Sequence, residues 1–97
     1  MQFKEVEFSK VPAFDHFKSR LGLLRPTFTP VKVGREFDAD IYRIYVQESN
    51  APRLPVDIDE YLLQNLEQNS HSSESTYSRE LLAKLDNLIE TAIHRLN

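Results

Sequence analysis

The side chains best suited to chemistry in this sequence are its clustered carboxylates. Asp57, Asp59 and Glu60 lie close together, and Asp38 and Asp40 form a second pair. Hard divalent cations prefer several oxygen ligands, and either group of acids supplies such oxygens. However, an acid followed by Glu three residues later is also a helix capping box, and acids in a first turn stabilise a helix. Because capping accounts for the first group and the second lacks a third ligand at a characteristic spacing, we expect no metal ion.

The usual signatures of enzymes are missing from the sequence. The three histidines, His16, His71 and His94, have none of the spacings of zinc-binding motifs. There is no cysteine, and two glycines in the whole sequence cannot build a phosphate-binding loop or a dinucleotide fingerprint. The serines of residues 70–78 lack the G-x-S-x-G context of a nucleophile. We therefore expect a protein without catalytic activity and without a cofactor.

Charge is distributed unevenly along the chain. Residues 1–35 carry seven basic and three acidic side chains, whereas residues 36–97 carry five basic and twelve acidic ones. Such asymmetry indicates either an anionic partner or two surfaces of opposite sign that meet within the fold or between protomers. Aromatic residues lie among the basic ones, as in proteins that bind single-stranded nucleic acid. The candidate patch for an anionic partner consists of Lys18, Arg20, Arg25, Lys32 and Arg35.

The clearest periodic pattern is at the end of the sequence. Residues 78–96 have apolar side chains three and four positions apart and contain neither Gly nor Pro, which predicts one long amphipathic helix. An apolar face of this kind must be buried, either against the protein's own sheet or against another chain. We expect it to mediate self-association or partner binding, and a homodimer is the favoured form. The candidate partner-binding residues are Leu85, Ile89, Ala92, Ile93 and Leu96.

The first half of the sequence predicts a strand, a helix and a hairpin. Alternating residues favour a short N-terminal strand within residues 1–8, and Ser9 and Pro12 suit the start of a helix over about 11–22. Residues 28–47 then read as an antiparallel hairpin that turns at Gly34-Arg35. Its second strand is rich in β-branched and aromatic residues. Both of its faces are partly apolar, so it is expected to be central in the sheet or covered on both sides.

The second half predicts a connection and two helices. Residues 48–55 contain two prolines and turn formers, so they read as a connection. Asp57 is then the expected cap of a helix over 57–68, and a polar loop over 69–76 leads to the last helix. The order β-α-β-β-α-α predicts a single domain over residues 1–97. Its fold class is α+β, with a small antiparallel sheet covered by helices.

These observations favour a small cytoplasmic protein that works through protein–protein interaction, in a regulatory role. No apolar run approaches the roughly 20 residues that span a membrane, so no membrane partner is expected. The first alternative is a nucleic-acid-binding regulator that uses the basic patch. The second is a small-molecule-binding domain with a pocket between the hairpin and the helices and with Tyr42, Arg43 or Tyr45 at its rim.

Overall fold

The computed structural model describes residues 3–69 and 76–94. These residues form a four-stranded sheet with three helices. This α+β class was predicted from the sequence. The order of the elements differs from the predicted order by one additional strand and one short 3₁₀ turn. The elements are β1 (Lys4–Val6), η1 (Phe8–Lys10), α1 (Phe14–Leu24), β2 (Phe28–Glu36), β3 (Ile41–Glu48), β4 (Leu54–Asp59), α2 (Glu60–Gln68) and α3 (Thr76–His94).

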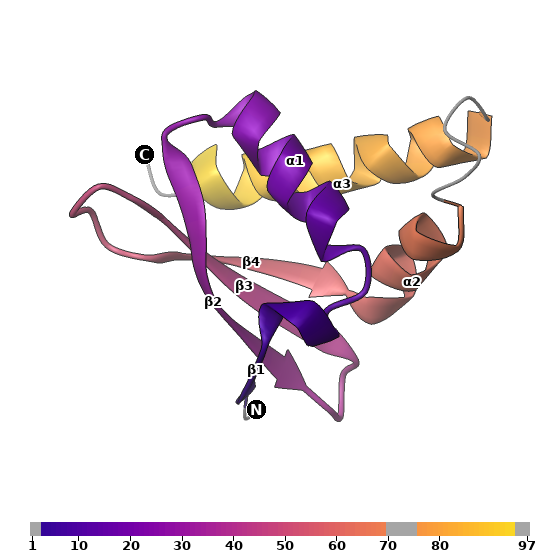
Figure 1. Cartoon of the computed structure of the whole chain (residues 1–97), viewed down its shortest axis with the longest axis horizontal. Helices are drawn as coiled ribbons and strands as arrows, with labels where there is room; N and C mark the ends of the chain where they lie inside the picture. The colour runs from indigo at the N-terminus through magenta and orange to yellow at the C-terminus, as the bar shows by residue number, and fades with distance from the viewer. Residues whose placement is uncertain (1–2, 70–75, 95–97) are drawn as a thin grey trace.

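The sheet is antiparallel throughout, with strands in the order β1-β2-β3-β4. The helices lie over one face of it (Figure 1). Tyr42, Ile44 and Val46 of the central strand β3 are buried on that face, next to Val56 and Ile58 of β4. Ile41, Arg43 and Tyr45 alternate with them on the other face and are half-buried. The central position predicted for this strand is therefore confirmed.

The hairpin is confirmed, but its turn is not at Gly34-Arg35. Both residues lie inside β2, and the turn is formed by residues 37–40. Gly34 is opposite Glu5 of β1, and a Cβ atom there would lie 3.0 Å from the Cβ of Phe3. The glycine thus allows β1 to approach closely rather than allowing the chain to reverse. Pro30 lies where β2 has no β1 partner, and the register with β3 shifts just after it.

The strand β4 was not predicted. Residues 54–59 alternate between less exposed and exposed side chains, and those at 56 and 58 are apolar and fully buried. An edge strand can carry Pro55 because half of its N–H groups have no ladder partner. The prediction of Asp57 as a helix cap was therefore wrong. Asp59 is the cap, since its Oδ1 accepts the Tyr61 N–H at 2.6 Å and α2 starts at the next residue.

The first helix starts and ends later than predicted. Residues 8–10 form the 3₁₀ turn η1, so Ser9 caps no α-helix. The N-cap of α1 is Ala13, which has a left-handed backbone with φ of 52° and no side chain able to cap. Gly22 lies within α1 and not at its C-terminal end. The α2 end at Gln68 agrees with the prediction, and most of the predicted polar loop, residues 70–75, is outside the described residues.

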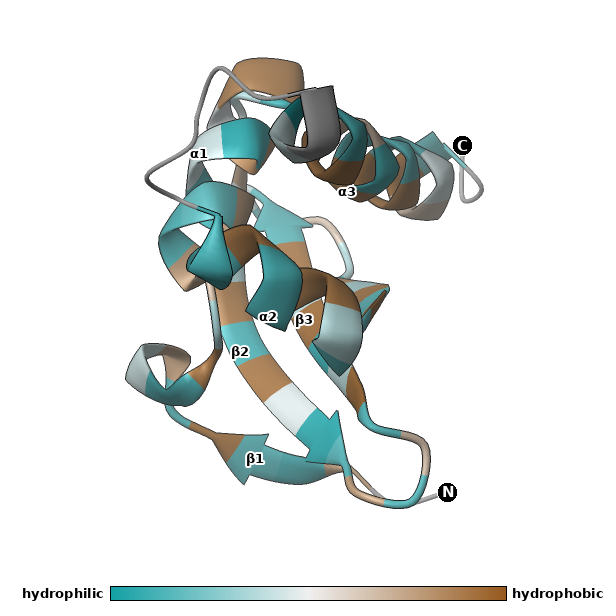
Figure 2. Ribbon diagram, turned by 90° about the vertical axis from the view of Figure 1, so that its right-hand side faces the viewer, coloured by the Kyte–Doolittle hydropathy of each residue, from teal (hydrophilic) through white to brown (hydrophobic). Residues whose placement is uncertain are grey.

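The apolar row of α3 completes the core. Leu81, Leu85, Ile89 and Ile93 recur every four residues and are at most 4% exposed. Helix α3 packs against β4, α1 and α2, and Figure 2 shows it beside α1 and above α2. Phe17 and Leu21 of α1 and Leu63 and Leu66 of α2 join the same core. None of the helices in the described parts of the chain has the length and apolar character needed to span a membrane.

We predict that Leu85→Ala destabilises the folded chain by about 2–5 kcal/mol, because it leaves a cavity where the side chain is fully buried. Urea denaturation followed by circular dichroism measures this loss. Leu23→Ala is the matched control, since Leu23 is 70% exposed, and it should change stability by about 0.5 kcal/mol or less. Equal losses in the two variants would contradict the core described above.

A second prediction compares the two glycines. Gly34→Ala should loosen the pairing of β1 with β2, because its methyl group meets Phe3, and hydrogen exchange of residues 4–6 should become faster. Gly22→Ala should instead stabilise the protein by about 0.8–1 kcal/mol, since helix α1 gains a better helix former and no atom lies within 4 Å of the added methyl group. Stabilisation by both changes would show that β1 leaves room at Gly34.

Candidate functional site

Most of the predicted partner-binding residues lie inside the protein. Leu85, Ile89 and Ile93 have no exposed surface and contact the sheet and helices of their own chain. Ala92 is half-buried against the same core, and Leu96 is outside the described residues. A partner therefore cannot reach the first three side chains while the chain is folded. The stripe that suggested an interface is mainly the hydrophobic core.

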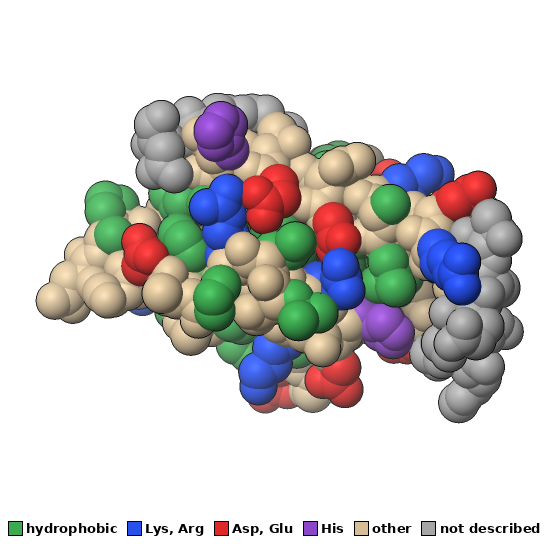
Figure 3. Space-filling model, turned by 90° about the horizontal axis from the view of Figure 1, so that it is seen from above, with side chains coloured by type: hydrophobic (Ala, Val, Ile, Leu, Met, Phe, Trp, Pro, Cys, Tyr) green, Lys and Arg blue, Asp and Glu red, His purple; other side chains and the backbone are tan. Residues whose placement is uncertain are grey.

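The predicted basic patch is divided among separate ion pairs. Arg20 of α1 donates two hydrogen bonds to Asp86 of α3, at 2.9 and 2.7 Å, and this contact raises the pKa of the guanidinium. Arg25, just after α1, donates to Glu90 at 2.7 Å. Figure 3 shows basic and acidic side chains side by side on the helical side of the molecule. These two arginines link α1 to α3.

Arg35 forms a third ion pair, in a polar cluster between the sheet and the start of α2. Its Nη2 atom lies 2.7 and 2.8 Å from the two carboxylate oxygens of Glu60, and Asp40 is 3.5 Å away. The guanidinium also lies against the rings of Phe37 and Tyr42, with its central carbon 4.7 and 5.5 Å from their centroids. Only 18% of the Arg35 side chain is exposed, so this cation is a structural one.

Two cations of the predicted patch remain outside these pairs. Lys18 is exposed on α1, and Lys32 is half-buried on β2, where it is opposite Tyr45 on the face away from the helices. The two lysines are thus on different sides of the sheet. Opposite charges from the two parts of the sequence meet within the fold, which is one of the two explanations that the charge pattern left open.

The three residues expected at the rim of a small-molecule pocket do not converge. Tyr42 is buried on the helical face of the sheet, whereas Arg43 and Tyr45 lie on the opposite face. Arg43 donates to Asp57 at 2.7 and 2.9 Å and lies over the ring of Phe3. The sheet itself separates these side chains, so they cannot line one pocket.

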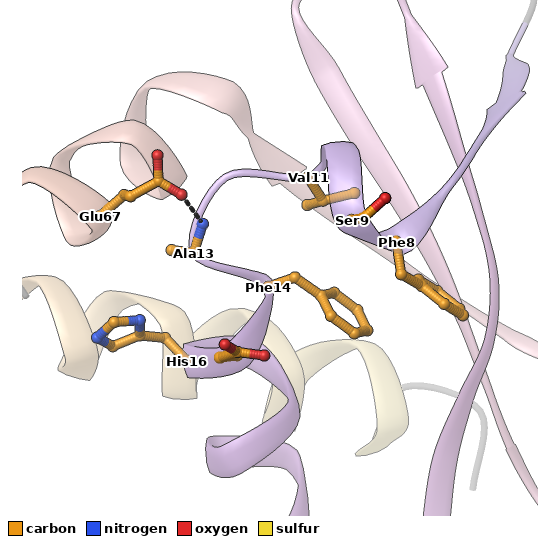
Figure 4. Close-up of a pocket in the computed structure, with 8 residues that line it drawn as sticks. Phe8, Ser9, Val11, Ala13, Phe14, His16 and Glu67 are labelled. Carbon is orange, nitrogen blue, oxygen red and sulfur yellow. Dashed lines mark hydrogen bonds between the residues drawn. The ribbon is translucent and has the colours of Figure 1, made fainter.

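A cavity of about 430 Å³ lies where the chain enters α1. Glu67 of α2 accepts the Ala13 N–H at 2.9 Å, which ties the residue before α1 to α2. Phe8 and Phe14 stack with their ring centroids 4.6 Å apart. Figure 4 shows Glu67 and His16 on one side of the Ala13 turn and the two rings on the other. The arrangement holds the start of α1, and the described residues contain no group of three or more potential metal ligands.

A larger groove of about 630 Å³ lies between α2 and α3. Leu62 and Leu88 are half-buried along it, and Leu81 forms part of the core beneath. Tyr61, at the start of α2, is 71% exposed. The remaining lining residues are polar, and they include one acid and one base on opposite walls: Asp59, Asn65, Lys84, Asn87 and Thr91. This groove is the candidate functional site.

The groove was not predicted from the sequence, for an identifiable reason. The apolar pattern of α3 was assigned to one face, although Leu88 lies to the side of the buried row. Val56 is buried in β4, whereas Tyr61, at the start of α2, is exposed to solvent. A groove between two helices depends on their relative position, which the pattern of either helix alone does not contain.

The polar cluster at Arg35 generates a prediction for alkaline pH. Burial raises the pKa of Tyr42 above its usual value of about 10, and the carboxylate of Glu60, to which its hydroxyl donates at 3.3 Å, raises it further. The folded state therefore holds this proton more tightly than the unfolded state. The stabilisation is complete below about pH 10 and is lost as the pH rises through the folded pKa.

Tyr42→Phe tests this linkage through the free energy of unfolding measured from about pH 7 to about pH 11. The variant should be less stable by about 1 kcal/mol at neutral pH because it loses the hydrogen bond to Glu60. The difference from the natural protein should shrink above about pH 10. Tyr61→Phe, which removes an exposed hydroxyl, is the control, and a difference of constant size would refute the linkage.

Comparisons with known proteins do not connect this fold or this groove to a described family. The chain matches no family model, no curated protein and no solved structure. Function lives in the chemistry of a site rather than in the fold alone. It must therefore be inferred from the groove and its lining side chains.

Proposed function

We propose that this chain is a protein-interaction domain and that the groove between α2 and α3 is its docking surface. The observation that carries the proposal is an exposed aromatic side chain, Tyr61, beside the half-buried Leu62 and Leu88. Tyrosine is enriched at interfaces because its ring is apolar and its hydroxyl stays hydrated. Apolar side chains of a partner that bury these three residues would gain the usual hydrophobic stabilisation.

The polar lining of the groove suits binding better than catalysis. It consists of amides, a hydroxyl and single charges: Asp59, Asn65, Lys84, Asn87 and Thr91. The carboxylate of Asp59 already accepts the Tyr61 N–H, and the side-chain nitrogen of Asn65 donates to the Tyr61 carbonyl. Such a rim surrounds an apolar centre with groups that can hydrogen-bond to a partner, which is the usual anatomy of a protein interface.

The remaining features of the proposal come from the sequence. The sequence contains no cysteine, which fits a protein of the reducing cytoplasm. We propose that the protein acts there in a regulatory role. Nucleic-acid binding has less support than protein binding, because Arg20, Arg25 and Arg35 each form an ion pair within the chain. A bound phosphate would have to compete with those carboxylates for the same cations.

Site-specific photo-crosslinking tests the docking surface. The photoreactive amino acid benzoylphenylalanine replaces Tyr61 in one variant and Leu23 of α1 in a matched variant, since the two side chains are 71% and 70% exposed. Illumination of the full chain in native extract should give a discrete crosslinked product only from position 61. The product should disappear when Leu88→Glu is added. The absence of a product at position 61, or equal products at both positions, would refute the groove as the docking surface.

A further inference from the structure

We propose that the occupant of the groove is a second copy of this chain, in a two-fold symmetric dimer. This inference rests on the proposed function, because it names the partner of the same surface. It is carried by the charges on the two walls. Asp59 caps α2, Lys84 is on α3, and no ion pair among the described residues joins them.

Most other charged groups near these helices are already used within the fold. Asp86 and Glu90 of α3 bind the arginines of the α1 region, and Glu60 of α2 binds Arg35. Lys84, by contrast, is exposed and has no ion-pair partner among the residues that the structure describes. Asp59 uses its Oδ1 atom as the helix cap, so its other oxygen can accept a further donor. The rim therefore presents one carboxylate with an oxygen that can accept a donor, and one cation of the opposite charge.

Two-fold symmetry turns this pair of charges into a self-complementary surface. In an isologous contact, residue i of one copy meets residue j of the other, and j meets i. A two-fold axis midway between the walls places each Asp59 opposite the Lys84 of the second copy, so two ion pairs form at once. The same operation brings Tyr61, Leu62 and Leu88 of both copies together. The apolar side chains then supply affinity, while the charges select the register.

The test measures the solution mass of the full chain by light scattering over a wide range of concentration. We expect a monomer–dimer equilibrium. Lys84→Glu and Asp59→Lys, each alone, should weaken dimerisation by about tenfold or more, because each places like charges in contact twice. An equimolar mixture of the two variants should dimerise again, since every contact in the mixed dimer pairs an acid with a base.

Two controls keep this result specific to the groove. Lys18→Glu makes the same charge change on the exposed surface of α1 and should leave dimerisation unchanged. Asp59→Asn retains an oxygen that can cap α2 while removing the charge, and circular dichroism verifies that each variant is folded. It should weaken dimerisation less than Asp59→Lys does.

Other outcomes overturn the inference in distinguishable ways. A natural chain that stays monomeric at all concentrations rejects self-association. A crosslinked product at position 61 that contains a different protein would then leave the docking function standing. If both charge-reversed variants dimerise as well as the natural chain, the contact lies elsewhere on the molecule. The same conclusion follows if the two variants fail to dimerise when mixed. A monomer that also gives no product at position 61 rejects the dimer and the docking surface together.

Discussion

One face of the sheet is apolar and must be buried, and this requirement governs how the helices are arranged. The central strand and β4 present Tyr42, Ile44, Val46, Val56 and Ile58 to that face. The four-residue row of α3 covers these side chains, and each fully buried Leu or Ile contributes about 1.5–3 kcal/mol to folding. A chain of 97 residues has a small core. The chain therefore cannot remain folded if this helix leaves the sheet to bind a partner.

Ion pairs orient the helices that hydrophobic burial has already brought together. Arg20 and Arg25 connect the α1 region to α3, and Arg35 connects the sheet to the first residue of α2. Each partly exposed ion pair of this kind contributes little to the free energy of folding, because forming it removes water from both charges and restricts both side chains. Their directionality is more important here, since a bidentate arginine fixes both distance and angle. The helix positions that define the groove follow from these contacts as well as from the core.

The groove lies between two helices that share a single core. Helix α2 has nine residues and α3 has nineteen, and both direct their most apolar face towards the sheet. Leu62 and Leu88 lie at the edges of those faces, where neither helix completely covers the other. An interface built from such edge residues leaves the core intact. The proposed interaction surface and the stabilising surface of α3 are thus adjacent but distinct.

Local periodicity and propensity act within one element, so they were enough to predict the fold class, the central strand and the long last helix. The charge asymmetry was also visible in the sequence, but its role in the fold was not. The burial of the α3 stripe in the core, and the use of Asp59 rather than Asp57 as the cap of α2, became known only from the folded arrangement. The same is true of Gly34, which serves strand contact and not a turn. These outcomes depend on which elements meet across long separations in sequence. A pattern within one segment is the same whether its partner is a neighbouring strand, another helix or a second protein.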